Sequence, residues 1–277
     1  MGAPQPGARR TGRDRMLPEP SAAMPMIEAR NLPRHVGIIM DGNGRWASDR
    51  GQPRPIGHRE GSKAVRRIVR LGRRIGLDAL TLYAFSFQNW SRPEDEVGAL
   101  MSLLYDYLVT ERQELLDTQI GLDAVGDLER LPAPVRQILD ALRDETRPGA
   151  EMMLTLALSY GGREEIAAAA RKLAERAAAG SLDPASIDAD SFGALLPSLR
   201  VGAPDLIIRT GGEMRISNFL LYGAAYAELY FSERLWPDFR EEDLFAAIAS
   251  YQRRERRFGG LGGAGKALAP QPASSGS

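Results

Sequence analysis

Short apolar runs alternate along this chain with longer segments whose apolar residues recur at helical spacing. The runs, several of them β-branched, predict strands at residues 35–40, 79–85, 121–127, 151–158, 205–210 and 227–232. Helical spacing is clearest at residues 61–76 and 94–118. Strands that are nearly all apolar and alternate with helices are typical of a parallel sheet covered on both faces. We therefore expect a single α/β domain with a central, mostly parallel six-stranded sheet flanked by helices.

Basic residues occupy the second face of the helix predicted at residues 61–76. That face carries Lys63, Arg66, Arg67, Arg70, Arg73 and Arg74. A charged face opposite an apolar stripe usually points into solvent. We therefore expect these side chains to be solvated.

The two ends of the 277-residue chain differ from its middle. Residues 1–26 are rich in Pro, Gly and Arg, and residues 260–277 contain few groups that a core could bury. We expect a disordered leader, a folded domain at residues 27–259 and a flexible tail. No window approaches the ~20 consecutive apolar residues that span a bilayer, which predicts a soluble protein.

Charge and cysteine content narrow the chemistry. Lys+Arg and Asp+Glu both count 36, so no overall basic field favours a nucleic-acid partner, and any affinity for anions must come from local clusters. The chain has no cysteine, which excludes disulfides, thiolate catalysis and cysteine-ligated metals. We expect a cytoplasmic protein.

Polar side chains follow four of the predicted strands. In an open parallel sheet, ligands bind outside the carboxyl ends of the strands. Asp41, Ser86, Tyr160 and Arg209 stand at such ends, so we expect them to gather at one rim. His35 precedes its strand and, at ~3.3 Å per residue, lies almost 20 Å from Asp41, which predicts a structural role.

The segment "DGNGRWA" at residues 41–47 has the composition of a phosphate cradle. Gly42 and Gly44 let backbone N–H groups approach an oxygen-rich ligand, and a helix starting near Arg45 adds its positive end. An ordinary strand-to-helix turn uses the same letters, and this segment alone favours the turn.

Three further segments change that balance. "RPIGHREG" brings two basic side chains close to a second expected helix start at Gly61, and "SFQNWSRP" and "IIRTGGEMRIS" each follow a strand. Four such segments at one rim predict a pocket for two diphosphates. The residues concerned are Arg54, His58, Ser86, Asn89, Trp90, Arg92, Arg209, Arg215 and Ser217.

A lone carboxylate among arginines has a use if it carries a divalent cation. Mg²⁺ normally takes one or two protein carboxylates together with phosphate oxygens and water. Asp41 is the first candidate ligand, and Glu228 in "YAELYF" is the second. Glu228 has an equal alternative, in which it caps a strand or pairs with an arginine.

Five blocks, in this order, resemble the cis-prenyltransferase family: "HVGIIMDGNGRWA", "GHREGSKAV", "LTLYAFSFQNWSRP", "YGGR" and "DLIIRTGGEMRISNFLLYGAAYAELYFSERLWPDF". The match covers about residues 33 to 259. It implies extension of an allylic diphosphate, usually farnesyl diphosphate, by repeated cis-condensation with isopentenyl diphosphate. The expected product is a long polyprenyl diphosphate such as undecaprenyl diphosphate, a lipid carrier precursor for cell-wall synthesis. The resemblance also implies Mg²⁺, a homodimer and transient membrane contact during product release.

The resemblance assigns roles to matching positions. Asp41 with Mg²⁺ assists departure of the allylic diphosphate, and Glu228 completes the metal shell. Asn89 matches the position assigned to proton removal; because a neutral amide is a poor base, positioning or relay is equally open. The allylic diphosphate is held by Gly42, Asn43, Gly44, Arg45, Arg54 and His58, with Arg92 nearby, and isopentenyl diphosphate by Arg209, Arg215 and Ser217. Further matching substrate-binding positions are Trp46, Ser86, Phe87, Gln88, Trp90 and Ile216.

The family also implies a hydrophobic tunnel for the growing chain. Val97, Leu100, Met101, Leu104 and Leu108 have the spacing to line it, although the pattern alone favours core packing. Small Ala84 matches a position where bulk shortens products, which favours a long chain. Arg257 to Gly259 match an R-x-G element that reaches the neighbouring subunit's site; the alternative is a helix ending at glycine.

The chain departs from the family pattern at Phe87 and Gln88, where a small residue and glutamate are usual, at Ser159 in place of asparagine, and at Met214 in place of histidine. These departures leave product length and starter open. Rival functions are an irregular terpene synthase on the same fold, a non-catalytic partner subunit, and an aspartyl phosphatase. Retention of Asp41, Arg45 and Asn89 disfavours the second. The third needs another acid at the position of Asn43.

Overall fold

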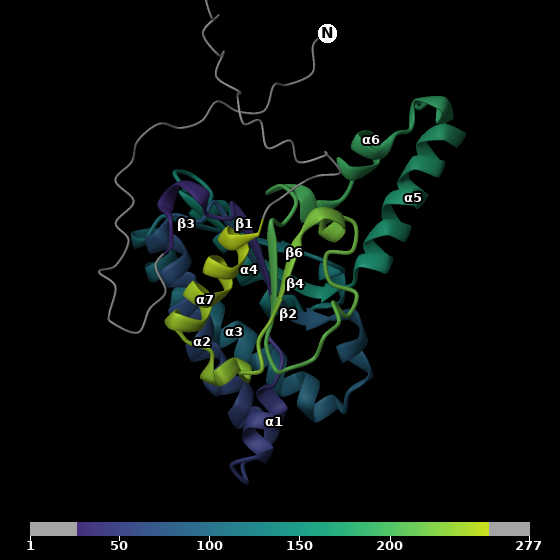
Figure 1. The fold of residues 1–277 in the computed structure, drawn as a ribbon. Helices are drawn as coiled ribbons and strands as arrows, with labels where there is room; N and C mark the ends of the chain where they lie inside the picture. Colours follow the sequence, from purple (N-terminus) through teal and green to yellow (C-terminus); the bar gives the residue numbers. More distant parts are fainter. Residues whose placement is uncertain (1–26, 255–277) are drawn as a thin grey trace, which may run out of the picture.

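The computed structural model describes residues 27–254, which form a six-stranded sheet in the order β3-β4-β2-β1-β5-β6 (Figure 1). Every neighbouring pair of strands is parallel. The expected mostly parallel sheet is confirmed, and each predicted strand is present within two residues of its expected ends. The strands are β1 (His35–Ile39), β2 (Ala79–Ser86), β3 (Ile120–Val125), β4 (Met152–Tyr160), β5 (Leu206–Arg209) and β6 (Glu228–Phe231).

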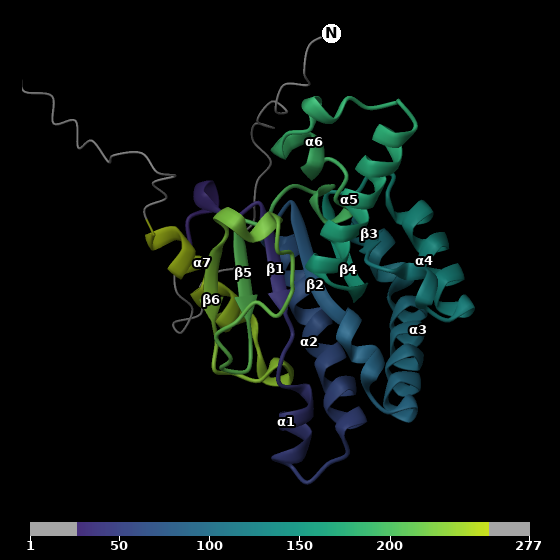
Figure 2. The same cartoon turned by 90° about the vertical axis from the view of Figure 1, so that its right-hand side faces the viewer.

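Strands β2, β4 and β3 lie on one side of β1, and strands β5 and β6 lie on its other side. This reversal makes the carboxyl end of β1 the point where loops diverge and a ligand crevice forms. In Figure 2 the strand arrows point toward the end of the molecule where α1 (Asn43–Ser48) lies. The segment 41–47 therefore lies at the carboxyl edge of the sheet, where ligands are expected to bind.

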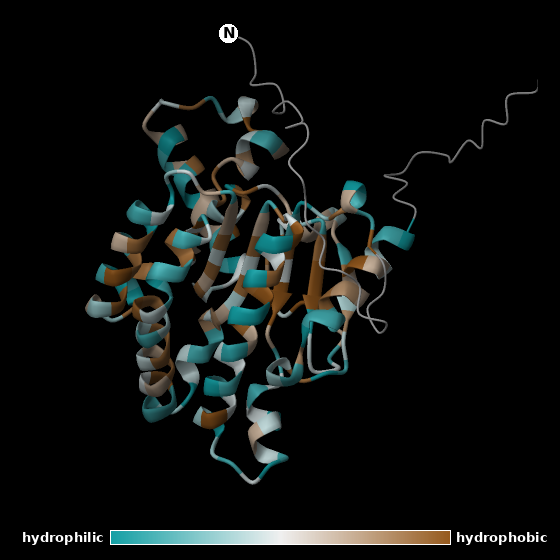
Figure 3. Cartoon of the chain, turned by 90° about the vertical axis from the view of Figure 1, so that its left-hand side faces the viewer, coloured by the Kyte–Doolittle hydropathy of each residue, from teal (hydrophilic) through white to brown (hydrophobic). Residues whose placement is uncertain are grey.

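Helices cover both faces of the sheet (Figure 1). One face carries the larger core, to which α2, α3, α4 and α7 contribute, while α5, α6 and the segment 216–227 lie on the other side. The hydropathy colouring of Figure 3 is brownest in the strands between the outer helices. The bounds are α2 (Arg54–Ile75), α3 (Glu94–Asp117), α4 (Ala133–Thr146), α5 (Gly162–Ala178), α6 (Ala189–Gly193) and α7 (Glu241–Arg253).

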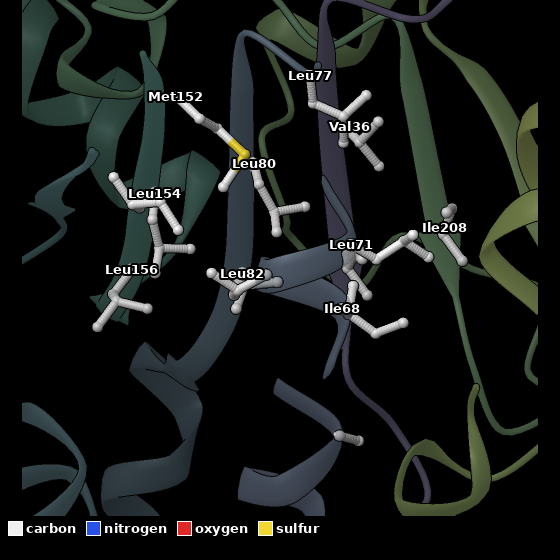
Figure 4. Packing of buried hydrophobic residues seen from close by; sticks show 14 of the residues in the cluster. Val36, Ile68, Leu71, Leu77, Leu80, Leu82, Met152, Leu154, Leu156 and Ile208 are labelled. Carbon is white, nitrogen blue, oxygen red and sulfur yellow. The ribbon is translucent and has the colours of Figure 1, made fainter. Parts of the chain in front are cut away.

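The apolar stripe of α2 lies at the centre of the core. Figure 4 shows Ile68 and Leu71 beside Val36 of β1, Leu82 of β2 and Ile208 of β5. Full burial of such a side chain stabilises the fold by roughly 1.5–3 kcal/mol. The helix ends at Ile75 and is capped by Gly76, whose φ of 88° is the left-handed conformation that closes many helices.

The expected start of α2 at Gly61 is wrong, because the helix already begins at Arg54. Gly57 and Gly61 serve close packing instead. A Cβ at Gly57 would lie 2.0 Å from the Asn43 carbonyl oxygen, and one at Gly61 would lie 2.2 Å from Asn43 Oδ1. The two glycines therefore let α2 pass directly beneath the first turn of α1.

The basic face of α2 is at least partly solvated, as expected, with Lys63, Arg70 and Arg74 exposed. Its arginines also make contacts that were not expected. Arg66 and Arg70 pair with Glu111 and Glu114 of α3, and Arg67 donates to carbonyl oxygens at Pro237 and Phe239. Arg73 and Arg74 pair with Glu151 and Glu241. Since these partners lie far away in sequence, the basic face joins α2 to its neighbours.

Some expectations fall outside the described residues. These are the leader at residues 1–26, the tail at 260–277 and the R-x-G element at 257–259. Within residues 27–254, no helix combines the length and the apolar character that crossing a membrane requires.

His35 is buried at the edge opposite the ligand crevice, as expected for a structural residue. Its Nδ1 lies 2.8 Å from the Gly202 carbonyl oxygen and its Nε2 lies 2.7 Å from Thr81 Oγ1. Nδ1 therefore carries the proton donated to the carbonyl, and Nε2 of the neutral ring accepts from the threonine. Burial lowers the pKa of His35 below its usual 6.5.

We predict that His35→Gln costs roughly 1–3 kcal/mol of unfolding free energy at pH 7.5, the usual cost of leaving buried polar partners unsatisfied, and that this cost shrinks toward pH 5. The wild-type contribution is complete above pH 6.5 and is lost as the pH falls, because the unfolded chain then takes up a proton that buried His35 refuses. Urea unfolding of both proteins at several pH values measures the difference. A cost that stays constant with pH would contradict the buried neutral ring.

Candidate active site

Asp41 stands just beyond β1, with its backbone fixed by two other segments. Its carbonyl oxygen accepts from Thr210 Oγ1 at 2.7 Å and from the Trp236 backbone N–H at 3.0 Å. Its carboxylate faces Arg209 at 2.8 Å and Arg45 at 3.3 Å. With 30% of its side chain exposed, the carboxylate is rigidly mounted yet open on one side.

Arg209 ends β5 beside Asp41, and only 5% of its side chain is exposed. Nη2 donates to Asp41, while Nη1 donates to Ser217 Oγ at 2.6 Å and to the Arg215 carbonyl oxygen. Its Nε is buried and has no partner in the part of the chain described.

The glycine loop, residues 41–44, leads from β1 into α1. Gly42 has φ 109°, and a Cβ there would lie 2.8 Å from Leu235, so only glycine fits. The following helix begins at Asn43, two residues before the expected Arg45. Asn43 Nδ2 donates to the Met40 carbonyl oxygen, whereas its Oδ1 is buried without a partner within residues 27–254.

Arg54, His58 and Arg92 lie together, as predicted, and Glu96 joins them. Glu96 Oε1 lies 2.8 Å from Arg92 Nη1 and 4.0 Å from Arg54 Nε. Arg54 also lies against Gly44, since a Cβ at that glycine would be 3.0 Å from its Nε. Burial first, and then the positive charge of Arg92, lower the pKa of His58 to about 4. The imidazole is therefore neutral at pH 7.

A cavity of about 690 Å³, counting its open mouth, extends from this rim between the sheet, α2 and α3. Asn43 and His58 line it near the rim, and its walls are mainly apolar. Of the predicted tunnel residues, Leu100, Met101 and Leu104 line the cavity. Val97 only packs against the hydrophobic core, and Leu108 is buried within that core. Ala84 lines the cavity as well, so the expected tunnel and its small wall residue are present.

The segment 86–92 borders the same rim. Asn89 Oδ1 accepts from the Ser86 backbone N–H at 3.0 Å, so the amide oxygen is engaged in capping the short turn Phe87–Ser91. Trp90 Nε1 donates to Ser159 Oγ at 2.9 Å. The Arg130 guanidinium lies 4.8 Å from the Phe87 ring centroid and 4.9 Å from that of Trp90. The departures at Phe87 and Ser159 thus belong to one packed cluster around Trp90.

The structure does not bring Glu228 to Asp41. Glu228 starts β6, opposite Leu206, whereas the carboxyl end of that strand approaches the rim through Ser232. Four residues at ~3.3 Å each separate Glu228 from Ser232 by roughly 13 Å along the strand. Glu228 pairs with Arg254 at 2.5 Å. The prediction that it shares a cation with Asp41 of its own chain is therefore wrong, and the arginine-pairing alternative is what the structure has.

Other predicted residues lie at or beside the rim with different surroundings. Trp46 Nε1 donates to Asp238, and the Arg50 guanidinium stacks over the Trp46 ring at 4.2 Å from its centroid. Trp46 thus packs beside the glycine loop. Gln88 is exposed, and Ile216 packs against the smaller core. Arg215 pairs with Glu213, and Met214 between them is 79% exposed. These positions border the site without completing it.

A divalent cation fits the rim in one form only. Within the described residues no group of three or more His, Cys, Asp or Glu side chains could hold a metal alone. Asp41 nevertheless offers a partly open carboxylate between arginines suited to phosphate. Asp41 would therefore be one carboxylate ligand of Mg²⁺, and phosphate oxygens of a bound substrate would supply others. Mg²⁺ is commonly bound in this way.

Sequence reasoning missed two residues of the site. Glu96 lies between Arg54 and Arg92, and its place at the start of the helix predicted at residues 94–118, four residues after Arg92, was an available signal. Asn218 ties the loop after Ser217 to the start of α5 by side-chain and backbone hydrogen bonds. Nothing local in the sequence marks that contact, since its partners lie more than fifty residues away.

Comparison with known proteins now decides the family. Residues 39–259 match the family model described as "Putative undecaprenyl diphosphate synthase". The chain belongs to the undecaprenyl diphosphate synthase family of prenyltransferases. It is 48% identical to an isoprenyl transferase of Chlorobaculum tepidum over 82% of this chain and 86% of that protein. The resemblance drawn from the motifs is confirmed.

Two further relatives bear on the activity. A ditrans,polycis-undecaprenyl-diphosphate synthase ((2E,6E)-farnesyl-diphosphate specific) of Xanthomonas axonopodis pv. citri is 48% identical over 86% of this chain and 93% of that protein. The crystal structure of lavandulyl diphosphate synthase from Lavandula x intermedia, in complex with dimethylallyl diphosphate, superposes with a TM-score of 0.81 at 38% identity, covering 83% of this chain and 99% of that chain.

We predict that Arg92→Gln raises the pKa of His58 above its value of about 4. After burial, the positive charge of Arg92 is the largest cause of the lowered pKa. Glu96→Gln should lower it, since that carboxylate stabilises the imidazolium. NMR titration of the imidazole signals measures both effects, and His35→Gln assigns the only other histidine. Arg50→Gln is the control, because Arg50 pairs with Asp238. Equal shifts in all three variants would contradict the local charge effect.

Proposed function

We propose that this prenyltransferase extends farnesyl diphosphate by successive cis-condensations with isopentenyl diphosphate and releases a long-chain polyprenyl diphosphate such as undecaprenyl diphosphate. One observation carries the proposal: a rim of arginines around a single carboxylate opens directly onto an apolar cavity. Such a site suits ligands with a diphosphate head and a hydrocarbon tail. The name of the Xanthomonas relative, at 48% identity, supports the same substrate and product.

The allylic diphosphate is assigned to the side of the rim built by the glycine loop, Arg54, His58 and Arg92. Its tail enters the cavity past Ala84. Arg54 and Arg92 neutralise charge that develops on the leaving diphosphate, and neutral His58 supplies a hydrogen bond from its buried ring. Asp41 would hold Mg²⁺ together with phosphate oxygens of the substrate, and the bound cation would further stabilise that charge.

Isopentenyl diphosphate is assigned to Arg209, Arg215 and Ser217. Arg209 contacts Asp41, so the two diphosphates share one border and their reacting carbons are held close. The proton lost after condensation leaves near Asn89. Its amide oxygen already accepts from Ser86, which favours positioning or relay to a phosphate oxygen over direct proton removal by the amide.

We infer a cytoplasmic homodimer that contacts membranes transiently when it releases product. The edge strand β6 has no further strand beside it among the described residues, and nearby Tyr226 is 77% exposed. These features support an interface at that edge. Exposed Tyr105 and Val109 on α3, the helix that lines the cavity, support the lipid contact.

An irregular synthase that joins two short allylic units is the second candidate, favoured by the superposition on lavandulyl diphosphate synthase. The two functions separate when the purified protein receives Mg²⁺ and either farnesyl with isopentenyl diphosphate or dimethylallyl diphosphate alone. Mass analysis should find one dominant long polyprenyl species from the first mixture. Short branched product from the second, with none from the first, would overturn the proposal.

We predict that Asp41→Ala lowers the condensation rate by about a thousandfold, or about 4 kcal/mol of barrier, because the cation loses its protein carboxylate and Arg209 its counter-ion. The protein should still fold, since the side chain fills no core volume, but with a lower free energy of unfolding because buried Arg209 loses its counter-ion. Steady-state kinetics with circular dichroism measure both. Asp49→Ala, at an exposed carboxylate just after α1, is the control. Turnover close to wild type in well-folded Asp41→Ala would remove Asp41 from the mechanism.

We also predict a division between the two diphosphate sites. Arg215→Ala should raise KM for isopentenyl diphosphate, and Arg54→Ala should raise KM for the allylic substrate, each by about ten- to a hundredfold, because charge-assisted contacts to phosphate act locally. Arg171→Ala, an exposed arginine on α5, should change neither. Steady-state kinetics in which one substrate is varied at a time give KM for both substrates in each variant. The reverse pattern would mean that the two sites are exchanged.

A further inference from the structure

Asn218 lies next to Ser217 and is bound on three sides. Its carbonyl oxygen accepts from the Gly162 N–H, its Oδ1 accepts from the Arg163 N–H, and its Nδ2 donates to Glu164 Oε2, each at 2.8 Å. Gly161, which precedes α5, has no side chain to cap the helix. A residue 55 positions further along the chain than Arg163 therefore caps α5.

The backbone around Asn218 is strained. Ser217 and Asn218 have φ values of 45° and 64°, and Leu220 has 46°. Left-handed conformations cost L-residues other than glycine roughly 1–2 kcal/mol each, with asparagine among the best tolerated. Consecutive strained residues persist when surrounding contacts hold them in place. Here those contacts are the bonds from Asn218 to the start of α5.

The strained segment determines where Arg209 points. Ser217 Oγ accepts from Arg209 Nη1, and the other terminal nitrogen of Arg209 donates to Asp41. On its other side, the Ser217 carbonyl oxygen receives Tyr83 Oη at 3.4 Å. A shift of Asn218 would thus displace the Ser217 hydroxyl and with it the orientation of the buried guanidinium.

Glu164 stabilises this arrangement from α5. Its carboxylate lies in the first turn of the helix, where negative charge is favourable, and it accepts from Asn218. There is no room for another group: a Cβ at Gly161 would lie 2.0 Å from Glu164 Oε2 and 2.6 Å from Asn218 Nδ2. The carboxylate, the amide and the glycine form a closely fitted contact.

We propose that Asn218, held by Glu164, is a positioning residue for the isopentenyl diphosphate subsite, an inference that rests on the proposed function. It touches neither Asp41 nor the cavity lining. Its effect passes through Ser217 to Arg209, so it acts first on isopentenyl diphosphate. Arg54, His58 and Arg92, which hold the allylic diphosphate under the proposed function, lie on α2 and the segment 86–92.

The test uses Glu164→Ala and Asn218→Gly. Glycine keeps the left-handed backbone but removes both side-chain bonds. KM for isopentenyl diphosphate should rise by about tenfold, as expected from loss of a bond that orients a charged group. KM for farnesyl diphosphate should stay within about twofold, since Arg54, His58 and Arg92 lie on other segments than Asn218 and Ser217. Calorimetric titration with isopentenyl diphosphate and Mg²⁺, without allylic substrate, should show the same weakening.

Two controls separate positioning from general stability. Glu164→Gln keeps an oxygen acceptor at the same place and should restore the affinity. Glu175→Ala removes an exposed carboxylate from the same helix and should change nothing. If both KM values and kcat change together, or only the melting temperature falls, the positioning role is overturned. If the variants bind isopentenyl diphosphate as the wild type does, it is overturned as well. Wild-type protein that binds no isopentenyl diphosphate would overturn the proposed function itself.

Discussion

The contact between Asp41 and Arg209 is the interaction on which the rim depends. A guanidinium buried at the end of β5 would cost several kcal/mol without a counter-charge, and Asp41, just beyond the neighbouring β1, provides it. The strands align Ile39 with Arg209, so the pair joins the neighbouring strands β1 and β5, at the point where the strand order reverses. The glycine loop departs from one partner and the strained segment at Ser217 is bound by the other. The two sides of the site are thus held at a fixed separation by one ion pair.

The sheet and the gathering of the rim could be predicted from the sequence because both depend on local, repeated signals. The strands are apolar on both faces, and all of them run parallel. Once that is granted, every residue after a strand falls at the same edge. Asp41, Arg209 and the cluster around His58 followed from this rule together with residue chemistry. The apolar wall at Leu100 and Leu104 followed from helical spacing and the family resemblance.

The misjudged residues all depend on a partner distant in sequence. Glu228 was placed by its motif, although it starts its strand and so belongs to the opposite edge. The arginines of α2 remain partly exposed, but their pattern gave no sign that Arg66 and Arg70 pair with Glu111 and Glu114 of α3. Asn218 has no local mark, because the N–H groups that it satisfies belong to α5. Such contacts become visible only when the tertiary packing of the elements is known.

The close approach of α2 to α1 limits how this protein can change. Gly57 and Gly61 face the backbone and side-chain oxygens of Asn43, with less room at either glycine than a methyl group needs. A side chain at either glycine would clash with Asn43 in the glycine loop, and a larger residue at position 43 would clash with α2. The geometry therefore couples the three positions: a larger side chain at one of them requires a compensating shift or substitution at another.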